Sequence, residues 1–280
     1  MRAVKKLLVG FVIILLIGIS LYCYARLIEP NMLQKNHISI AVPDNVEEIK
    51  IVFFTDTHFG KFYPQEKITK LVNSINEQLP DFVIFGGDLI DNYARDQEIL
   101  NLEELSKSLS MINATHGKIA VFGNHDYGGG SAPIYEKLMT KGGFTVLTDE
   151  ELSFSNLNLS IIGYEDSLLG NVDLNRYELP DAPFRIVVTH EPDVVDNIKA
   201  TGSILVLAGH SHGGQVSLPV LTKKVLPKGA EKYIKGQYDL KNVITGSDAS
   251  MIVSQGIGMT IQPFRFLNPP EIVIVSLKHE

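Results

Sequence analysis

The sequence predicts an α/β domain in which much of the strand pairing is parallel. Short, continuous apolar runs indicate strands that are buried on both faces of a sheet. Amphipathic stretches with helical spacing lie between several of these runs, as expected for strand–helix–strand units. Each run also ends abruptly in polar residues, and in open α/β sheets ligands bind beyond the carboxyl ends of the strands. The runs are Ile51–Phe54, Phe82–Phe85, Ile119–Phe122, Ile186–Val188 and Ile204–Ala208.

The composition is that of an acidic globular protein. The chain has 280 residues, of which 45% are apolar and 20% are charged. Its 25 Lys and Arg residues are outnumbered by 32 Asp and Glu residues, which gives a net charge of -7. Because phosphates are held by Lys and Arg, we expect no nucleic-acid partner. A single cysteine excludes an intramolecular disulfide and a cysteine-rich zinc site.

The amino terminus is predicted to anchor the chain in the cell membrane by a single pass. Leu7–Ala25 carries no charge, and at about 1.5 Å per residue it is long enough to cross a hydrocarbon core of about 30 Å. Residues 1–6 include Arg2, Lys5 and Lys6. This positive charge favours a cytoplasmic amino terminus and an extracytoplasmic domain. Membrane lipid is therefore an expected partner.

Two kinds of processing are alternatives to a retained anchor, namely cleavage as a signal peptide and lipidation at Cys23. The residues on either side of Cys23 are tyrosines, whereas cleavage sites favour small residues. If the anchor is retained, residues 26–36 form a connector that spans at most roughly 35–40 Å even when extended. The domain at 37–280 would then lie close to the membrane.

The remaining elements follow in order along this domain. Alternating apolar residues at His37–Val42 predict an edge strand. Helices are predicted between the buried strands at Pro64–Leu79, Leu100–Ile112, Ala132–Lys141 and Asp193–Lys199. After Gly213 the helical pattern is lost, and strands are predicted at Val216–Leu218, Lys241–Ile244, Met251–Ser254 and Glu271–Leu277. These later strands would form a second sheet that closes the same domain.

The polar residues at the strand ends are candidate metal ligands. Together they supply carboxylate oxygen, amide oxygen and imidazole nitrogen, which suit Mn, Fe, Co, Ni or Zn. They are too many for one tetrahedral ion, and they fit two divalent ions about 3.5–4 Å apart that share a carboxylate. The candidates are Asp56, His58, Asp88, Asn124, His190, His210 and His212.

The order of these residues resembles the calcineurin-like metallophosphoesterase family, from roughly Ile49 to the carboxyl terminus. The tail around Val253–Gly258 and Arg265 is similar to the membrane-associated bacterial branch typified by YkuE- and YaeI-type phosphodiesterases. The matching motifs are Asp56-x-His58, Gly87-Asp88-x-x-Asp91, Gly123-Asn124-His125-Asp126, Thr189-His190 and Gly209-His210-x-His212.

The resemblance implies a fold and a set of roles. The fold would be a four-layer α/β/β/α sandwich with two mixed sheets. One ion would take Asp56, His58 and His212, the other Asn124, His190 and His210, and Asp88 would bridge them. His125 would protonate the leaving oxygen, and Asp91 would orient His125. With Mn²⁺ as the most expected ion, a metal-bridging hydroxide would attack a phosphodiester or pyrophosphate bond.

Two details of the sequence bear on the substrate. Asp91 is followed by Asn92-Tyr93, where the Ser/Thr protein phosphatases of the family have Arg-Gly, which argues against a phosphoprotein substrate. Phe59, Phe62 and Tyr63 follow the first motif and form either an apolar rim beside the site or ordinary core. A rim, combined with the short connector, favours the hypothesis of a lipid-linked phosphoester.

Three points stay open at this stage. Asp126 either orients His125 or simply ends the turn. A metal-dependent amidohydrolase is disfavoured, since that class opens with His-x-His and this chain has Asp56-x-His58. The remaining alternative is a non-catalytic metal-binding or tethering domain at the cell surface, which would have no use for His125.

Overall fold

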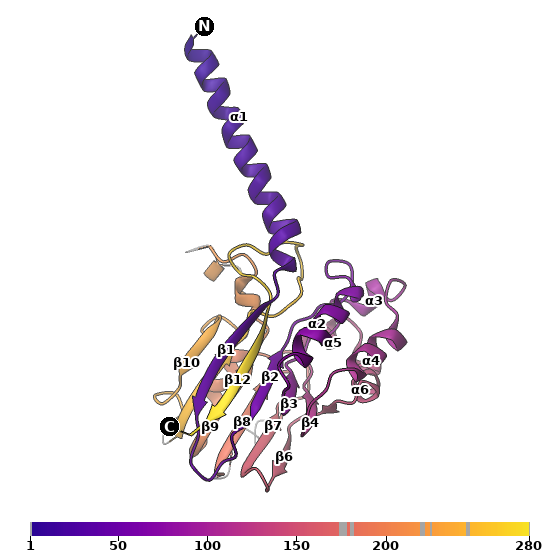
Figure 1. The fold of residues 1–280 in the computed structure, drawn as a ribbon, viewed down its shortest axis with the longest axis vertical. Coiled ribbons are helices and arrows are strands. Elements are labelled where there is room, and N and C mark those ends of the chain that lie inside the picture. Colours follow the sequence, from indigo (N-terminus) through magenta and orange to yellow (C-terminus); the bar gives the residue numbers. More distant parts are fainter. Residues whose placement is uncertain are drawn as a thin grey trace.

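Two mixed sheets pack face to face, and a long helix projects from one end of them (Figure 1). The computed structural model describes residues 2–279 apart from 174–177, 180–181, 219–221, 225 and 245–246. The first sheet has the order β1-β12-β2-β3-β4-β5 and the second β10-β11-β9-β8-β7-β6. The strands are β1 (Gln34–Ala41), β2 (Lys50–Phe54), β3 (Phe82–Phe85), β4 (Gly117–Ala120), β5 (Thr145–Val146), β6 (Glu150–Phe154), β7 (Leu159–Gly163), β8 (Phe184–Thr189), β9 (Gly202–Ala208), β10 (Gly236–Asp239), β11 (Ser247–Val253) and β12 (Glu271–Lys278).

Helices cover the outer face of the first sheet (Figure 1). The α-helices are α1 (Arg2–Cys23), α2 (Ile68–Asn76), α3 (Tyr93–Asp96), α4 (Leu102–Ser110), α5 (Asn124–Gly128) and α6 (Ala132–Lys141). A π-helical turn follows α1 at Tyr24–Ile28, and 3₁₀ turns lie at Glu29–Asn31, Gln65–Lys67, Pro192–Asn197, His212–Gly214 and Thr222–Lys224.

The central strands are buried on both faces, as their continuous apolar runs predict. In β2, Ile51 and Phe53 point into the core between the sheets, whereas Val52 and Phe54 pack outward against the helices. In β8, Ile186 faces the same central core. On the far side of the second sheet, the 3₁₀ turn Pro192–Asn197 and irregular chain form the cover. The four-layer sandwich is confirmed, with a thin fourth layer in the part of the chain that the structure describes.

The division of strands between the sheets differs from the prediction. The second sheet does not arise from the chain after Gly213, because β8 and β9 already belong to it and β12 returns to the first sheet. Between β4 and β8, the strands β5, β6 and β7 were not expected. Strand pairing is set by long-range packing, which local periodicity does not encode.

Two predicted strands are wrong. Val216–Leu218 contributes only an isolated bridge between Val216 and Phe266. Lys241–Ile244 forms a turn after β10, from which Ile244 still reaches the core. Apolar runs this short have no resolvable period, so they do not distinguish a strand from a turn that buries one or two side chains.

The predicted helix Asp193–Lys199 is a 3₁₀ turn, and the predicted helix Pro64–Leu79 is confirmed as α2 with its preceding 3₁₀ turn.

The predicted connector, residues 26–36, is helical up to Asn31, and its last residues belong to β1. The helical segment runs from Arg2 to Asn31 and includes the residues that are long and apolar enough to cross a membrane. Its end packs on the domain through Glu29, a buried carboxylate that accepts the backbone N–H groups of Leu267 and Asn268. The backbone N–H of Arg265 donates to Ala25. The helix is therefore fixed to the domain.

Strand direction places the strand ends of interest beside α1. Strand β1 starts directly after the helix and runs parallel to β12, which is antiparallel to β2. Val273 of β12 pairs with Asn36, near the start of β1, and with Phe53, near the end of β2. The start of β1 and the end of β2 therefore lie at the same edge of the sheet. Strands β3 and β4 are parallel to β2. The carboxyl ends of all three strands therefore lie at the end of the domain from which α1 projects (Figure 1).

The buried carboxylate of Glu29 gives a test of the fixed helix. Substitution Glu29→Ala leaves the N–H groups of Leu267 and Asn268 without partners, and should lower the free energy of unfolding by about 1–3 kcal/mol. Denaturant titration in detergent measures this. Glu77→Ala, which removes an exposed ion pair with Lys35, should change the value by less than about 1 kcal/mol. Equal effects of the two changes would contradict a structural role for Glu29.

Candidate metal centre

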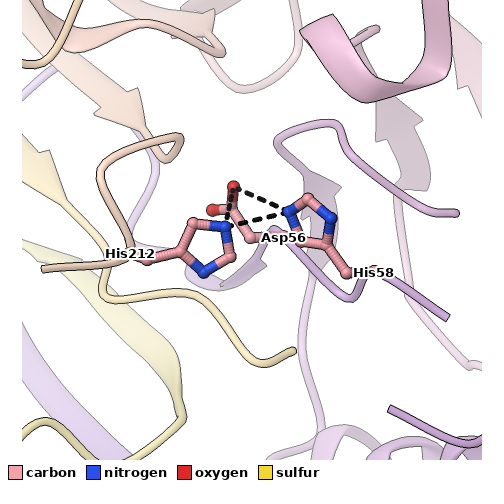
Figure 2. A group of neighbouring side chains, drawn as sticks. All are labelled: Asp56, His58 and His212. Carbon is pink, nitrogen blue, oxygen red and sulfur yellow. Dashed lines mark hydrogen bonds and ion pairs between the residues drawn. The ribbon is translucent and has the colours of Figure 1, made fainter. Parts of the chain in front are cut away.

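All seven predicted ligands meet at the carboxyl ends of strands from both sheets. Asp56 and His58 follow β2, Asp88 follows β3, and Asn124 starts α5 after β4. The second sheet supplies His190 after β8, and His210 and His212 after β9. Potential ligand atoms lie within 4.8 Å of one another in three sets, Asp56–His58–His212, Asp88–His190–His210 and His58–Asp88–His125. Figure 2 shows the first set, with the Asp56 carboxylate beside the two imidazoles.

The distances between these atoms match those around a bound cation. His58 Nε2 lies 2.9 Å from His212 Nε2 and 3.3 Å from Asp88 Oδ2. On the other side, the same Asp88 oxygen lies 3.1 Å from His190 Nε2, which is 3.3 Å from His210 Nδ1. Ligands at bond lengths of roughly 2.0–2.2 Å are about 2.8–3.6 Å apart in octahedral or tetrahedral geometry. Asp88 Oδ2 thus lies between two sets of nitrogens.

Hydrogen bonds at the far side of three imidazoles, those of His58, His190 and His210, select the nitrogen that faces the site. His190 Nδ1 donates to the Gly86 carbonyl at 2.7 Å, and His210 Nε2 donates to the Lys228 carbonyl at 2.9 Å. A carbonyl oxygen only accepts, so the other nitrogen of each ring presents a lone pair to the centre. His58 Nδ1 is held by the Asp91 carboxylate at 3.1 Å in the same way. Fixed tautomers of this kind are typical of metal-ligating histidines.

Asn124 supplies an independent observation. Its side-chain Oδ1 is buried and has no hydrogen-bond partner in the structure. An unsatisfied buried oxygen costs about 1–3 kcal/mol, and coordination of a cation removes that cost. Gly123, the residue before it, leaves no room for a side chain, since a Cβ there would lie 2.4 Å from Asp88 Oδ1. The residues present therefore fit a pair of divalent cations.

Backbone strain is concentrated at the same residues. Five of the predicted ligands have positive φ angles: Asp56 (54°), His58 (43°), Asp88 (60°), His210 (64°) and His212 (49°). Residues other than glycine rarely adopt this conformation, which costs on the order of 1–3 kcal/mol each. Such strain persists only where the surroundings enforce it, and it is typical of sites that hold a ligand.

The electrostatics favour ionised carboxylate at the centre. Burial alone would raise the pKa of Asp88, but His190 and His58 hold it well below its usual range. Burial alone would lower the pKa of His58, but Asp88 and Asp91 raise it to about 9. The negative charge of Asp88 therefore attracts either protons on these rings or a cation. A bound cation displaces the protons, because metal ligands bind as neutral imidazole and carboxylate.

His125 lies within ligand distance of His58 and Asp88, although it was not among the predicted ligands. Its Nδ1 donates to the backbone carbonyl of Asp91 at 2.7 Å, and its backbone N–H donates to Asp88 Oδ1 at 2.7 Å. The His125 side chain is 28% exposed, whereas those of His58 and His190 are fully buried. His125 is thus the imidazole of the cluster that solvent or a substrate reaches.

Asp91 contacts two imidazoles in different ways. Its carboxylate is closer to His58 than to His125, at 3.1 Å against 3.5 Å, and its carbonyl oxygen holds His125. Burial alone would raise the pKa of Asp91, but His58, Arg95 and Thr260 hold it well below its usual range. Asp91 therefore contacts His125 most closely through its main-chain carbonyl. Its carboxylate, which was predicted to orient His125, lies closer to His58.

Asp126 does neither of the two things expected of it. Its buried carboxylate accepts the backbone N–H groups of Asp88 (2.9 Å), Leu89 (3.2 Å) and Gly123 (3.0 Å). Burial and the charge of Asp88 raise its pKa to about 7. Asp126 thus ties the loop after β3 to the loop after β4. The sequence offered no signal for this role, because the partners are main-chain groups.

A cavity of about 820 Å³ opens beside the centre. Asp88, Asn124 and His125 are among the residues that line it, and its apolar lining residues include Val216, Leu218, Pro227 and Ile261. Of the two alternatives for Phe59, Phe62 and Tyr63, the structure shows ordinary core rather than a rim. Phe59 and Tyr63 are buried in the core beneath the helices, and Phe62 is half-buried against it. The apolar wall comes instead from segments that are distant in sequence.

This arrangement of a two-sheet sandwich with adjoining cation sites is that of a metal-dependent phosphohydrolase. The chain belongs to the calcineurin-like phosphoesterase family, whose sequence profile matches residues 49–214. It is 37% identical to the metallophosphoesterase YkuE of Bacillus subtilis, over 92% of this chain and 90% of that protein.

Two further relatives carry names that specify a reaction. Phosphodiesterase YaeI of Escherichia coli is 26% identical over 84% of this chain and 84% of its own length. UDP-2,3-diacylglucosamine pyrophosphatase LpxG of Chlamydia muridarum is 23% identical over 92% of this chain and 93% of its own length. The predicted membership of the family is confirmed.

Metal addition tests whether Asn124 is a ligand. Mn²⁺ at about 100 times its Kd should stabilise the folded protein by about 2.7 kcal/mol per site. Asn124→Ala should not lower the metal-free stability, and should raise it by up to about 1–3 kcal/mol, because it removes a buried oxygen that has no partner there, but it should reduce the gain that Mn²⁺ produces. Thermal unfolding with and without Mn²⁺ or EDTA measures both quantities. An equal loss of stability in both conditions would identify Asn124 as a purely structural residue.

Proposed function

We propose that the protein is a membrane-anchored dinuclear phosphodiesterase that hydrolyses a phosphodiester or pyrophosphate bond in a lipid-linked substrate. The observation that supports this most directly is the cavity, which joins the candidate metal centre to an apolar wall. A phosphoester at the centre would place an attached acyl chain against Val216, Leu218 and Ile261. The diacylated substrate in the name of LpxG is in keeping with this chemistry.

The geometry supports the following ligand roles. Asp56, His58 and His212 would hold one ion, Asn124, His190 and His210 the other, and Asp88 Oδ2 would be shared. When bound, two divalent cations, for which we propose Mn²⁺, supply charge neutralisation at the phosphoryl oxygens and a nucleophile from water near neutral pH. The protein holds His58, His190 and His210 with little freedom, since their far-side nitrogens are bonded to main-chain or carboxylate oxygen.

His125 would act as the general acid. Its Nδ1 is committed to the Asp91 carbonyl, so Nε2 is the atom free to give a proton to the leaving oxygen. An imidazole is suited to this step because its ordinary pKa of about 6.5 is close to neutral pH. Asp91 would act as a positioning residue, through its carbonyl on His125 and through its carboxylate on His58.

We further propose that residues 7–25 are a retained anchor and that residues 37–280 lie on the extracytoplasmic side. Retention is supported by the contacts of the helix end, where the Tyr22 and Tyr24 rings pack on Phe264 and Phe266. Cleavage after Ala25 would remove both tyrosines. The positive charges at residues 1–6 support the sidedness.

The substrate proposal is tested with the full chain in mixed micelles containing Mn²⁺. A lipid-bearing diester or pyrophosphate should be hydrolysed with a kcat/KM at least about tenfold above that of a matched substrate without acyl chains, since each buried methylene contributes about 0.8 kcal/mol. Leu218→Ser should reduce this ratio, and Ile99→Ser, at an exposed position outside the cavity, should not. Equal turnover of both substrates would refute the lipid-linked substrate, and no hydrolysis of either would refute the enzyme.

The roles of His125 and Asp88 predict different outcomes. His125→Ala should lower kcat by about 10²–10⁴-fold while the protein keeps its metal. Asp88→Asn should remove metal and activity together, because Asp88 Oδ2 lies between both ligand sets. Metal content by elemental analysis and single-turnover rates measure the two effects. Loss of metal from the His125 variant would show that His125 is a ligand rather than an acid.

A further inference from the structure

The turn Thr260–Gln262 lies close to the level at which α1 leaves the membrane. The Tyr22 ring packs on Phe264 at 5.5 Å between ring centroids, and the Tyr24 ring packs on Phe266 at 6.3 Å. Tyr22 and Tyr24 both belong to the proposed span, residues 7–25. A ring in contact with the end of a membrane helix lies at the depth of the bilayer interface, where tyrosine is itself enriched. The segment that carries Phe264 therefore reaches the lipid surface.

Within this segment an apolar side chain is held outward. Ile261 is 78% exposed and has a φ of 60°, a conformation that is a marked outlier for a β-branched residue. The turn is closed by a hydrogen bond from the Gln262 N–H to the Thr260 carbonyl. Leu267, six residues later, is also exposed, as is Leu27 in the helix end. Strain that presents an apolar residue to water indicates a partner for that residue.

The turn is also attached to the candidate metal centre. The Gln215 side chain makes three hydrogen bonds to the turn. It accepts one from the Thr260 N–H at 3.0 Å and donates to the carbonyls of Thr260 (3.1 Å) and Gln262 (2.7 Å). The Thr260 side chain hydrogen-bonds to Asp91. Because Gln215 and Ile261 both line the cavity, the turn is at once a wall of the cavity and a neighbour of the membrane helix.

Basic side chains gather at the same end of the domain. Lys67 and Lys70 line a shallow pocket with Pro30 and Asn31 of the helix end. Burial lowers the pKa of Lys67, and the positive charges of Lys70 and Arg26 lower it further. Lys70 Nζ donates to the Asn31 carbonyl at 2.9 Å, and Lys67 Nζ lies over the Tyr63 ring at 4.5 Å. None of the three has an acidic partner among the residues that the structure describes. In a chain of net charge -7, this cluster favours an anionic surface.

We propose that the domain docks on the bilayer that α1 spans, with Ile261 inserted at the interface and the cluster Arg26, Lys67 and Lys70 bound to anionic lipid headgroups. The inference rests on the proposed membrane anchoring and extends it. The cavity mouth at Ile261 then opens at the lipid surface. A lipid-linked substrate would reach the metal centre along this wall without leaving the bilayer.

The absence of tryptophan from the chain makes a direct test available. Ile261→Trp places a single indole at the proposed contact. Leu79→Trp is the matched control, because Leu79 is 80% exposed and precedes β3, at the end of the sheet away from α1. The full chain is reconstituted in phosphatidylglycerol–phosphatidylcholine vesicles with lipids brominated on the acyl chains. Emission from the Ile261→Trp variant should shift to the blue and be quenched at least twofold more than emission from the Leu79→Trp variant.

Charge reversal tests the basic cluster in the same vesicles, in the background of the Ile261→Trp variant. Lys67→Glu/Lys70→Glu should reduce the quenching of its indole in vesicles with phosphatidylglycerol and have little effect in pure phosphatidylcholine. Lys107→Glu/Lys137→Glu makes the same charge change on the exposed faces of α4 and α6, and should leave the quenching unchanged. Thermal unfolding of each variant checks that it is folded. Equal effects of the two double substitutions would overturn the role of the cluster.

Flotation of the vesicles distinguishes a failure of membrane anchoring by α1 from a failure of the docking of the domain. If both single-indole variants float with the vesicles and the indole at position 261 is quenched no more than the indole at position 79, docking is overturned and the anchor is left intact. A protein that does not float at all would overturn both the anchor and the docking. Quenching confined to the indole at position 261 in a floating protein supports both.

Discussion

The structure depends on one electrostatic constraint, the convergence of buried electron-pair donors at a point where strands from two sheets end. Asp56, Asp88 and four imidazoles lie within a few ångströms of one another with almost no access to water. Neutral acceptors and carboxylates crowded in this way repel unless positive charge lies between them. Positive φ angles at five of these residues add local strain. The two apolar layers that sandwich the first sheet supply the stability against which this cost is set. A divalent pair at the centre would convert the repulsion into attraction.

The predictable part of the fold is the part in which local sequence and burial agree. Strands such as β3 and β8 are buried on both faces, so nearly every side chain is apolar and the run is visible without knowledge of its partners. The assignment of strands to sheets was not predictable in this way. Strand β12 crosses back to pair with β2 because its residues fill the central core, and nothing within Glu271–Leu277 specifies that partner. Short apolar segments such as Val216–Leu218 fail for the opposite reason, since they line a cavity instead of a sheet.

The site shows the same division between ligands and their supports. The ligands were predictable because each directly follows a buried strand, and parallel strand ends meet at one edge. Their supporting contacts were not, because they are made by main-chain atoms or by residues far along the chain. Asp126 acts on backbone N–H groups, His125 is held by a carbonyl, and Gln215 joins loops that are distant in sequence. The placement of Phe59 and Tyr63 was also not predictable, because an apolar residue next to a motif can pack in the core or line the rim of a site. Both pack in the core.

The direction of the first strand decides what the metal centre faces. Strand β1 leaves the helix end and runs away from it, and its neighbours require β2, β3 and β4 to run back toward the helix. Every loop that carries a ligand from the first sheet is thus returned to the end of the domain beside α1. An extended connector would allow the domain to turn away from this orientation. The helical residues 24–31 and the buried Glu29 remove that freedom. The orientation of the centre toward the end that carries α1 is therefore a property of the topology, maintained by a rigid joint.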